Sequence, residues 1–177
     1  MGRRFRFGVQ TGPFADREAL ASHARKVEDL GYAELFSYDH VGDVDPFLPL
    51  VVAAEATSSL RLGPLVVNNE LHHPALLART AASFDVLTGG RLVLGMGTGY
   101  MRSEHDATGI ELRPPGARVD RLAESVEVVR RLLDNGSCTF AGEHVRVDLA
   151  DLGVRPVQPS VPLRVGGQGR RKVQLAA

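Results

Sequence analysis

Apolar and polar positions along the chain follow two periods by turns, the two-residue alternation of strands and the 3.6-residue spacing of helices. Residues 5–9 alternate aromatic or branched side chains with arginine or glycine, which is the pattern of a half-buried strand. Residues 17–30 place leucine, alanine and valine at helical spacing behind the capping residue type Asp16, and this helix is expected to end at Gly31. Similar runs predict strands at 35–38, 61–68, 91–97 and 162–166, helices opened by Pro46 and Pro74, a helix around 122–133, a hairpin at 135–148 and the start of a helix at 170–177.

Strand and helix therefore alternate from one end of the chain to the other. That order is typical of βαβ units and a parallel sheet, either closed or open. Neither a second domain nor a repeat of solenoid length interrupts the alternation. We therefore interpret residues 1–177 as a single α/β domain.

Composition narrows the class of protein further. The chain has 177 residues, of which 44% are hydrophobic, so it can bury a sizeable core. Its 21 basic and 21 acidic residues cancel, which gives no support for a nucleic-acid or membrane-surface partner. No apolar run approaches the roughly 20 residues of a membrane span. Cys138 is the one cysteine, so no internal disulfide forms, and a cytoplasmic location is expected.

The stretch from Leu92 to Tyr100, Leu-Val-Leu-Gly-Met-Gly-Thr-Gly-Tyr, has the most distinctive pattern. A dinucleotide-binding loop needs G-x-G-x-x-G on the first strand–helix turn, whereas this run has G-x-G-x-G on the fourth predicted strand. A tight turn alone would explain only part of such a run. The glycines favour a ligand pressed against the strand end, because glycine has no Cβ to keep a flat group away.

Polar residues follow the second predicted strand, in the tetrapeptide Ser37-Tyr38-Asp39-His40. Parallel α/β proteins bind ligands beyond the carboxyl ends of their strands, where Asp39 and His40 could bind a ring and move a proton. The tetrapeptide by itself favours a structural role instead. In that role Asp39 caps the next turn and His40 packs at the surface.

Two further stretches bear on ligand binding. Residues 165–172 are glycine-rich and basic but lack the Walker pattern, so they could offer backbone N–H groups to an anion or form a plain turn with a solvated basic face. His72 and His73 are adjacent and do not share a helix face, so we interpret them as loop residues. We therefore expect no metal site, and no motif of a nucleophilic enzyme is present.

Several stretches, taken in order, carry a resemblance that covers essentially the whole chain. They are Phe-Gly-Val-Gln at 7–10, Ser-Tyr-Asp-His at 37–40, Leu-Val-Val-Asn-Asn at 65–69, His-Pro-Ala-Leu-Leu-Ala-Arg at 73–79, the run from Ser83 to Tyr100, Arg-Leu-Ala-Glu-Ser-Val at 121–126 and Pro-Leu-Arg-Val-Gly-Gly at 162–167. Together they resemble the bacterial-luciferase-like superfamily of flavin and deazaflavin oxidoreductases. The branch that uses coenzyme F420 is the most similar, and Thr88–Tyr100 is the most specific part.

The resemblance implies a (β/α)₈ barrel of the TIM type with a flavin-like ring at its carboxyl-end face, where a hydride is transferred. It implies that His40 is the catalytic, proton-handling residue and that a non-proline cis peptide joins Leu65 and Val66 behind the ring. The cofactor-binding residues that it implies are Asp39, Leu65, Val66, Val67, Asn68, Gly97, Thr98, Gly99 and Tyr100 near the ring, and Gly166, Gly167 and Gly169 near the phosphate tail.

One position departs from the pattern of the F420 branch. Its sugar-phosphate dehydrogenases place a glutamate directly after Gly-Thr-Gly, as a general acid. This chain has Tyr100 there, and Glu104 follows four residues later. The departure argues against a glucose-6-phosphate-type reaction and leaves the general acid unassigned.

Three functions compete. The first is an F420-dependent oxidoreductase acting on a small organic substrate, which the basic residues 170–172 favour because the tail of F420 is acidic. The second is an FMN-dependent monooxygenase, and the third is a non-catalytic cofactor-binding protein. A full barrel takes about 250 residues, and about five βα units are predicted here. We therefore expect an incomplete barrel, either a fragment of a longer protein or a chain that closes against a partner, and a homodimer.

Overall fold

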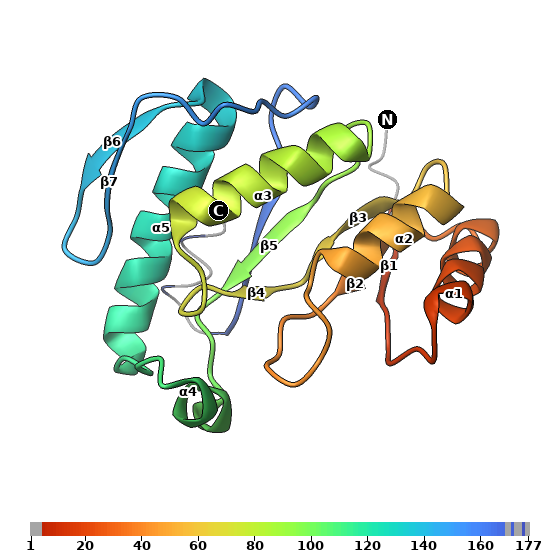
Figure 1. Cartoon of the computed structure of the whole chain (residues 1–177), viewed down its shortest axis with the longest axis horizontal. Coiled ribbons are helices and arrows are strands. Elements are labelled where there is room, and N and C mark those ends of the chain that lie inside the picture. The colour runs from red at the N-terminus through yellow and green to blue at the C-terminus, as the bar shows by residue number, and fades with distance from the viewer. Residues whose placement is uncertain (1–4, 169–170, 172–174, 176–177) are drawn as a thin grey trace.

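The structure is a computed structural model, which describes residues 5–168, 171 and 175 (Figure 1). Its elements follow one another as β1 (Gly8–Gln10), α1 (Arg17–Asp29), β2 (Glu34–Ser37), α2 (Leu48–Ala56), β3 (Arg61–Pro64), β4 (Val67–Asn68), α3 (Pro74–Leu87), β5 (Leu94–Gly97), α4 (Arg102–Thr108), α5 (Pro115–Asn135), β6 (Cys138–Ala141), β7 (Arg146–Leu149) and β8 (Leu163–Gly166). The predicted alternation of strand and helix is confirmed, and the predicted hairpin is the antiparallel pair β6–β7.

The strands β1, β2 and β3 form one parallel sheet, and β4, β5 and β8 form another. Backbone hydrogen bonds from Val93 N to Leu62 O, 2.9 Å, and from Leu62 N to Arg91 O, 2.8 Å, join the two sheets where β3 passes β5. Within the described residues β1 pairs only with β2, and β8 only with β5, so the barrel is not closed. The fold is therefore the expected open part of a TIM-type barrel.

The strand predicted over 61–68 is two strands, so that prediction is wrong in its continuity. β3 pairs with β2, whereas β4 pairs with β5, and the chain changes partners between them. The peptide bond between Leu65 and Val66 lies at this change and is cis, as the resemblance implied. The apolar run alone could not show the change, because both halves are equally buried.

Two helix predictions need correction. The second helix begins at Leu48 rather than Pro46, because the carboxylate of Asp45 accepts the N–H groups of Phe47 and Leu48, at 2.7 and 3.1 Å, and so caps the helix there. The short helix α4 was not predicted at all. Its sequence, Arg-Ser-Glu-His-Asp-Ala-Thr, has no apolar periodicity, and its buried residues are the polar Glu104 and His105.

The core lies between the sheets and the helices that cover their outer face, mainly α2, α3 and α5 (Figure 1). One buried carboxylate, that of Asp85 at the end of α3, ties this layer to the segment before β8. It accepts the N–H groups of Val157 and Gln158 at 2.8 and 3.0 Å, and that of Leu92 at 3.3 Å. Asp85 thereby places the segment from which β8 enters the sheet. None of the described helices is long and apolar enough to cross a bilayer.

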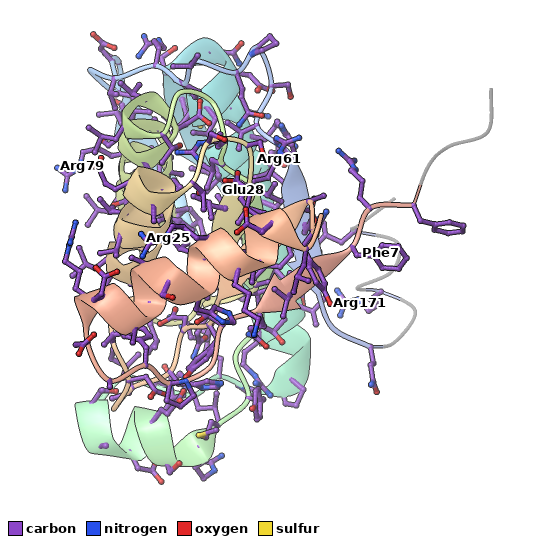
Figure 2. The ribbon with its side chains drawn as sticks, turned by 90° about the vertical axis from the view of Figure 1, so that its right-hand side faces the viewer. Phe7, Arg25, Glu28, Arg61, Arg79 and Arg171 are labelled. Carbon is purple, nitrogen blue, oxygen red and sulfur yellow. The ribbon has the colours of Figure 1, made fainter. Side chains whose placement is uncertain are left out.

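A second carboxylate, that of Glu28 on α1 (Figure 2), accepts hydrogen bonds from the turn before β3. These bonds are expected to make the free energy of unfolding depend on pH. Burial raises the pKa of Glu28, but hydrogen bonds from Ser59 Oγ and from the backbone N–H groups of Ser58, Ser59 and Leu60 outweigh it, so the pKa is lowered. A carboxyl with a lowered pKa stabilises the fold above its unfolded pKa, about 4.3, and this stabilisation is lost as the pH falls through its folded pKa.

We therefore expect Glu28→Gln to lower the free energy of unfolding by about 1 kcal/mol at pH 7, since the group is only half-buried. The difference from the wild type should shrink as the pH is lowered from 7 towards 3, because the stabilisation requires the charged carboxyl and is lost as the pH falls through the lowered pKa of the folded state. Urea unfolding at the two pH values measures it. Glu18→Gln, which removes the exposed ion pair between Glu18 and Arg25, is the control and should change little. An equal loss for both variants would contradict the assigned role of Glu28.

Candidate functional site

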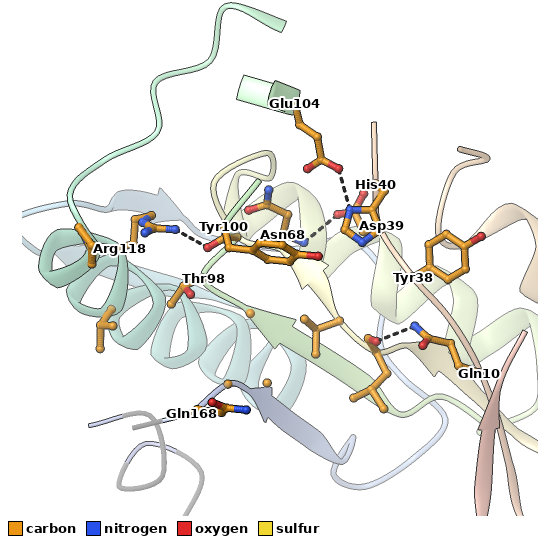
Figure 3. A pocket seen from close by; sticks show the side chains of 18 residues that line it. Gln10, Tyr38, Asp39, His40, Asn68, Thr98, Tyr100, Glu104, Arg118 and Gln168 are labelled. Atoms are coloured by element: carbon orange, nitrogen blue, oxygen red, sulfur yellow. Dashed lines mark hydrogen bonds and ion pairs between the residues drawn. The ribbon is translucent and has the colours of Figure 1, made fainter. Parts of the chain in front are cut away.

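A cavity of about 790 Å³ lies where the carboxyl ends of β1, β2, β4, β5 and β8 meet (Figure 3). This is the edge at which parallel α/β proteins bind ligands. Most of the predicted site residues line it, although they come from four separate parts of the chain. They are Asp39, His40, Leu65, Val66, Asn68, Gly97, Thr98, Gly99, Tyr100, Gly166 and Gly167.

Two predicted residues do not belong to this lining. Val67 is fully buried in the hydrophobic core, because successive side chains of a strand point to opposite faces and its neighbours face the cavity. Gly169 lies outside the described residues, as do Arg170 and Lys172. Arg171 forms an ion pair with Asp120 on an exposed surface. Lining residues that were not among the predicted site residues are Gln10, Tyr38, Glu104, Pro115, Arg118, Val119 and Gln168.

The imidazole of His40 is paired with the carboxylate of Glu104. The distance from His40 Nδ1 to Glu104 Oε1 is 2.6 Å, and Glu104 is 5% exposed while the His40 side chain is 31% exposed. A carboxylate only accepts, so Nδ1 donates and Nε2 is left as the nitrogen that can exchange a proton with a ligand. Sequence spacing alone did not assign Glu104, because the turn of α4 that brings it back to His40 has no apolar signal.

Two tyrosines flank this pair. The ring of Tyr38 lies 5.8 Å from that of His40, and the ring of Tyr100 meets the His40 ring edge to face at 6.1 Å. Tyr100 is 71% exposed, so it stands at the mouth of the cavity rather than inside its wall. His40 is thus enclosed by Glu104 on one side and by aromatic rings on two others.

Asp39 joins the end of β2 to the end of β4. Its Oδ2 accepts the backbone N–H of Asn68 at 2.8 Å (Figure 3). The same oxygen lies 2.8 Å from Nε2 of His72. The structural role that the tetrapeptide favoured, capping of the next turn by Asp39, is therefore wrong. His72 precedes α3 as a loop residue, as expected, but its contact with Asp39 could be found only in three dimensions.

The glycines of β5 and β8 accommodate protein side chains and also line the cavity, so the contact between ligand and glycines stays a prediction. A Cβ on Gly97 would overlap Val66 Cγ2, and one on Gly166 would lie 2.7 Å from Val66 Cγ1. Gly99 has a φ of +64°, and a Cβ there would overlap the amide of Asn68. The missing side chains therefore let Val66 and Asn68 form the wall of the cavity.

A buried ionic cluster holds the loop between β4 and α3. The carboxylate of Glu70 accepts from Arg113 at 2.8 Å and from Arg121 at 3.3 Å, and Arg121 also donates to the carbonyl oxygens of Asn69 and His72. Burial lowers the pKa of Arg121, and the neighbouring Glu70 opposes this shift. The cluster fixes the loop from which His72 reaches Asp39.

Two further donors brace the rim of the cavity. Arg118 of α5 donates to the carbonyl oxygen of Gly99, and Gln10 donates to that of Leu65 at 3.2 Å. Among the described residues, no three histidine, cysteine, aspartate or glutamate side chains gather as a metal site. The polar side chains that face the cavity can form hydrogen bonds with a ligand.

Comparison with known proteins places this geometry in a family. The family model described as luciferase-like monooxygenase matches residues 4–177. The chain belongs to this family. A luciferase-like chain was expected from the resemblance, and the open parallel sheet and the cavity at its carboxyl edge agree with that membership.

Luciferase-like relatives resemble this chain along nearly all its length. The 5,10-methylenetetrahydromethanopterin reductase of Archaeoglobus fulgidus is 31% identical over 172 residues, 97% of this chain and 50% of the relative. The coenzyme F420 dependent tetrahydromethanopterin reductase of Methanopyrus kandleri has a TM-score of 0.84 at 29% identity, over 97% of this chain and 52% of that one. An F420-dependent secondary alcohol dehydrogenase, solved with an F420–acetone adduct, has a TM-score of 0.82 at 25% identity, over 96% and 54%. The chain thus spans about half the length of these relatives.

Proposed function

We propose that the cavity binds the ring of coenzyme F420 and that the protein transfers a hydride between F420 and a small organic substrate. The observation that carries the proposal is the His40–Glu104 pair, which lies in the cavity at the carboxyl ends of the strands. The two F420-dependent proteins compared above share this fold over about half of their own length, at 29% and 25% sequence identity.

The residues present fit a flat, partly polar ring. Gly97 and Gly166 make room for Val66, which provides an apolar surface in the wall of the cavity. Asn68 supplies a hydrogen-bonding group at the edge of that surface. When bound, F420 would supply the hydride acceptor or donor of the reaction.

The chain's own part in the reaction is to move a proton. A substrate that loses a hydride from carbon also loses a proton from its oxygen or nitrogen, and His40 Nε2 is the group that can accept it. Glu104, hydrogen-bonded to Nδ1, stabilises the resulting imidazolium. In the reverse direction His40 donates the proton.

Cofactor retention tests the proposal. The chain is incubated with F420 or with FMN, free ligand is removed and the absorbance spectrum is read. Retained F420 is the expected result. Retention of FMN alone would replace the proposal with the flavin monooxygenase, and retention of neither would leave the non-catalytic interpretation.

Glu104→Gln tests the pairing within the site. The amide oxygen can still accept from Nδ1, but the neutral amide lacks the charge with which the carboxylate stabilises the imidazolium, so proton transfer to Nε2 becomes less favourable. We expect turnover with F420 to fall about 10²-fold, with retained F420 unchanged. Glu111→Gln, at an exposed position just beyond α4, is the matched control. Turnover that survives in Glu104→Gln would contradict the proton-handling role of the pair.

A further inference from the structure

The side-chain amide of Asn68 lines the cavity and forms hydrogen bonds with residues outside β4. Its Oδ1 accepts the backbone N–H of Glu70 at 3.1 Å, and its Nδ2 lies 3.4 Å from Nε2 of His105. Asn68 is 5% exposed, and the absent side chain of Gly99 leaves the space in which this amide lies. The question is whether these contacts allow one orientation of the amide or two.

His105, the residue after Glu104 on α4, determines which atom donates in the hydrogen bond between Asn68 and His105. Its side chain is 2% exposed, and its Nδ1 lies 3.0 Å from the carbonyl oxygen of Ile110. A carbonyl only accepts, so Nδ1 carries the proton, and in a neutral imidazole Nε2 is then an acceptor. His105 therefore requires a donor at Asn68, and the amide nitrogen is that donor.

A reversed amide would break both contacts. Asn68 Oδ1 would then face the unprotonated Nε2 of His105, which places acceptor against acceptor. Nδ2 would face the N–H of Glu70, which places donor against donor. Buried polar groups without partners cost about 1–3 kcal/mol each. Of the two hydrogens on Nδ2, His105 takes one, and within the described part of the chain the other has no acceptor.

We propose that His105 is a positioning residue that holds the Asn68 amide so that its second N–H points to a hydrogen-bond acceptor of the ligand. The acceptor is a carbonyl oxygen or an unprotonated nitrogen at the edge of the ring. This inference rests on the proposed function for the identity of that ring, whereas the orientation itself belongs to the protein alone. One turn of α4 thus serves the site twice, with Glu104 at His40 and His105 at Asn68.

The first test needs no cofactor. Long-range proton–nitrogen NMR spectra of the chain labelled at histidine nitrogen report the tautomer of each ring, and the spectrum of His105→Gln assigns the signals of His105. We expect the neutral Nδ1–H form at pH 7. An Nε2–H tautomer, or a charged ring at that pH, would overturn the proposal, because neither can accept from Asn68.

The second test measures the dissociation constant of F420. We expect it to rise about tenfold in Asn68→Asp, which replaces the donor with an acceptor, and in His105→Leu. His105→Gln should recover most of this loss, because Oε1 can replace Nε2 as the acceptor. Circular dichroism confirms that each variant is folded, and Asn68→Asp leaves α4 untouched.

The outcomes separate the two proposals. Unchanged binding by Asn68→Asp, or a His105→Gln variant no better than His105→Leu, would overturn the positioning role even if F420 binds. If the wild type binds neither F420 nor FMN, the proposed function fails, and the tautomer of His105 alone decides the orientation of Asn68.

Discussion

His40→Ala should reduce turnover with F420 by about 10²–10⁴-fold and leave the affinity for F420 within a few-fold of the wild type. The reason is that Nε2 is the proposed proton-exchanging atom of the site, whereas most of the lining of the cavity comes from other residues. Nδ1 is held by Glu104 at 2.6 Å, so alanine removes both the proton acceptor and the partner of a carboxylate that is 5% exposed. The change is followed as loss of the F420 absorbance on mixing with substrate.

A control variant must show that the loss of any imidazole does not by itself reduce turnover. His23 lies on the exposed face of α1, so His23→Ala should retain full turnover. A separate titration of F420 distinguishes chemistry from binding in His40→Ala. If affinity and turnover fall together, or if neither falls, His40 is a packing residue and the proton-handling role is wrong.

Gly97→Val should abolish retention of F420, and it should act through Val66. A Cβ on Gly97 would overlap Val66 Cγ2, so either Val66 or the backbone of the strand would have to shift. The overlap would push Val66 into the cavity or push β4 away from β5. Overpacking of this kind costs about 1–3 kcal/mol, so we expect the chain to remain folded with a lower unfolding midpoint.

Absorbance after removal of free F420 measures retention, and far-ultraviolet circular dichroism measures helix content. Gly12→Val is the matched control, because a Cβ on Gly12 meets no atom within 4 Å. A Gly97→Val chain that binds F420 as the wild type does would show that Val66 has room to move, and that the glycine run has only a packing role.

The spacing of apolar residues and the residue types that are common in turns and helix caps were enough to predict most helices and strands. The apolar spacing of residues 17–30 and the cap at Asp16 agree with α1, whose first N–H groups include the bond from Ala19 to Asp16 Oδ1 at 2.8 Å. Such signals are local, since a helix or strand depends on residues a few positions apart. The glycine run of 95–99 likewise indicated the end of a strand. It did not show which side chains fill the space that the glycines leave.

The candidate site was predictable where it follows a strand and not where it depends on a distant partner. Asp39 and His40 follow β2 and Asn68 ends β4; the resemblance implied all three as site residues, and the parallel order of the strands brings them to one edge. Glu104 and His105 belong to a helix without apolar periodicity, and no local pattern shows that it turns back over the cavity.

The sequence by itself therefore determined the alternating α/β order, the strand ends that form the cavity and, through its motifs, the family. Only the tertiary structure decided which side chains meet there. Glu104 reaches His40 across 64 positions and His105 reaches Asn68 across 37, while Val66 covers Gly97 and Gly166 from a neighbouring strand. The physical reason is that these contacts depend on the direction in which each folded segment leaves its strand, and that direction is set by packing between segments far apart in the chain.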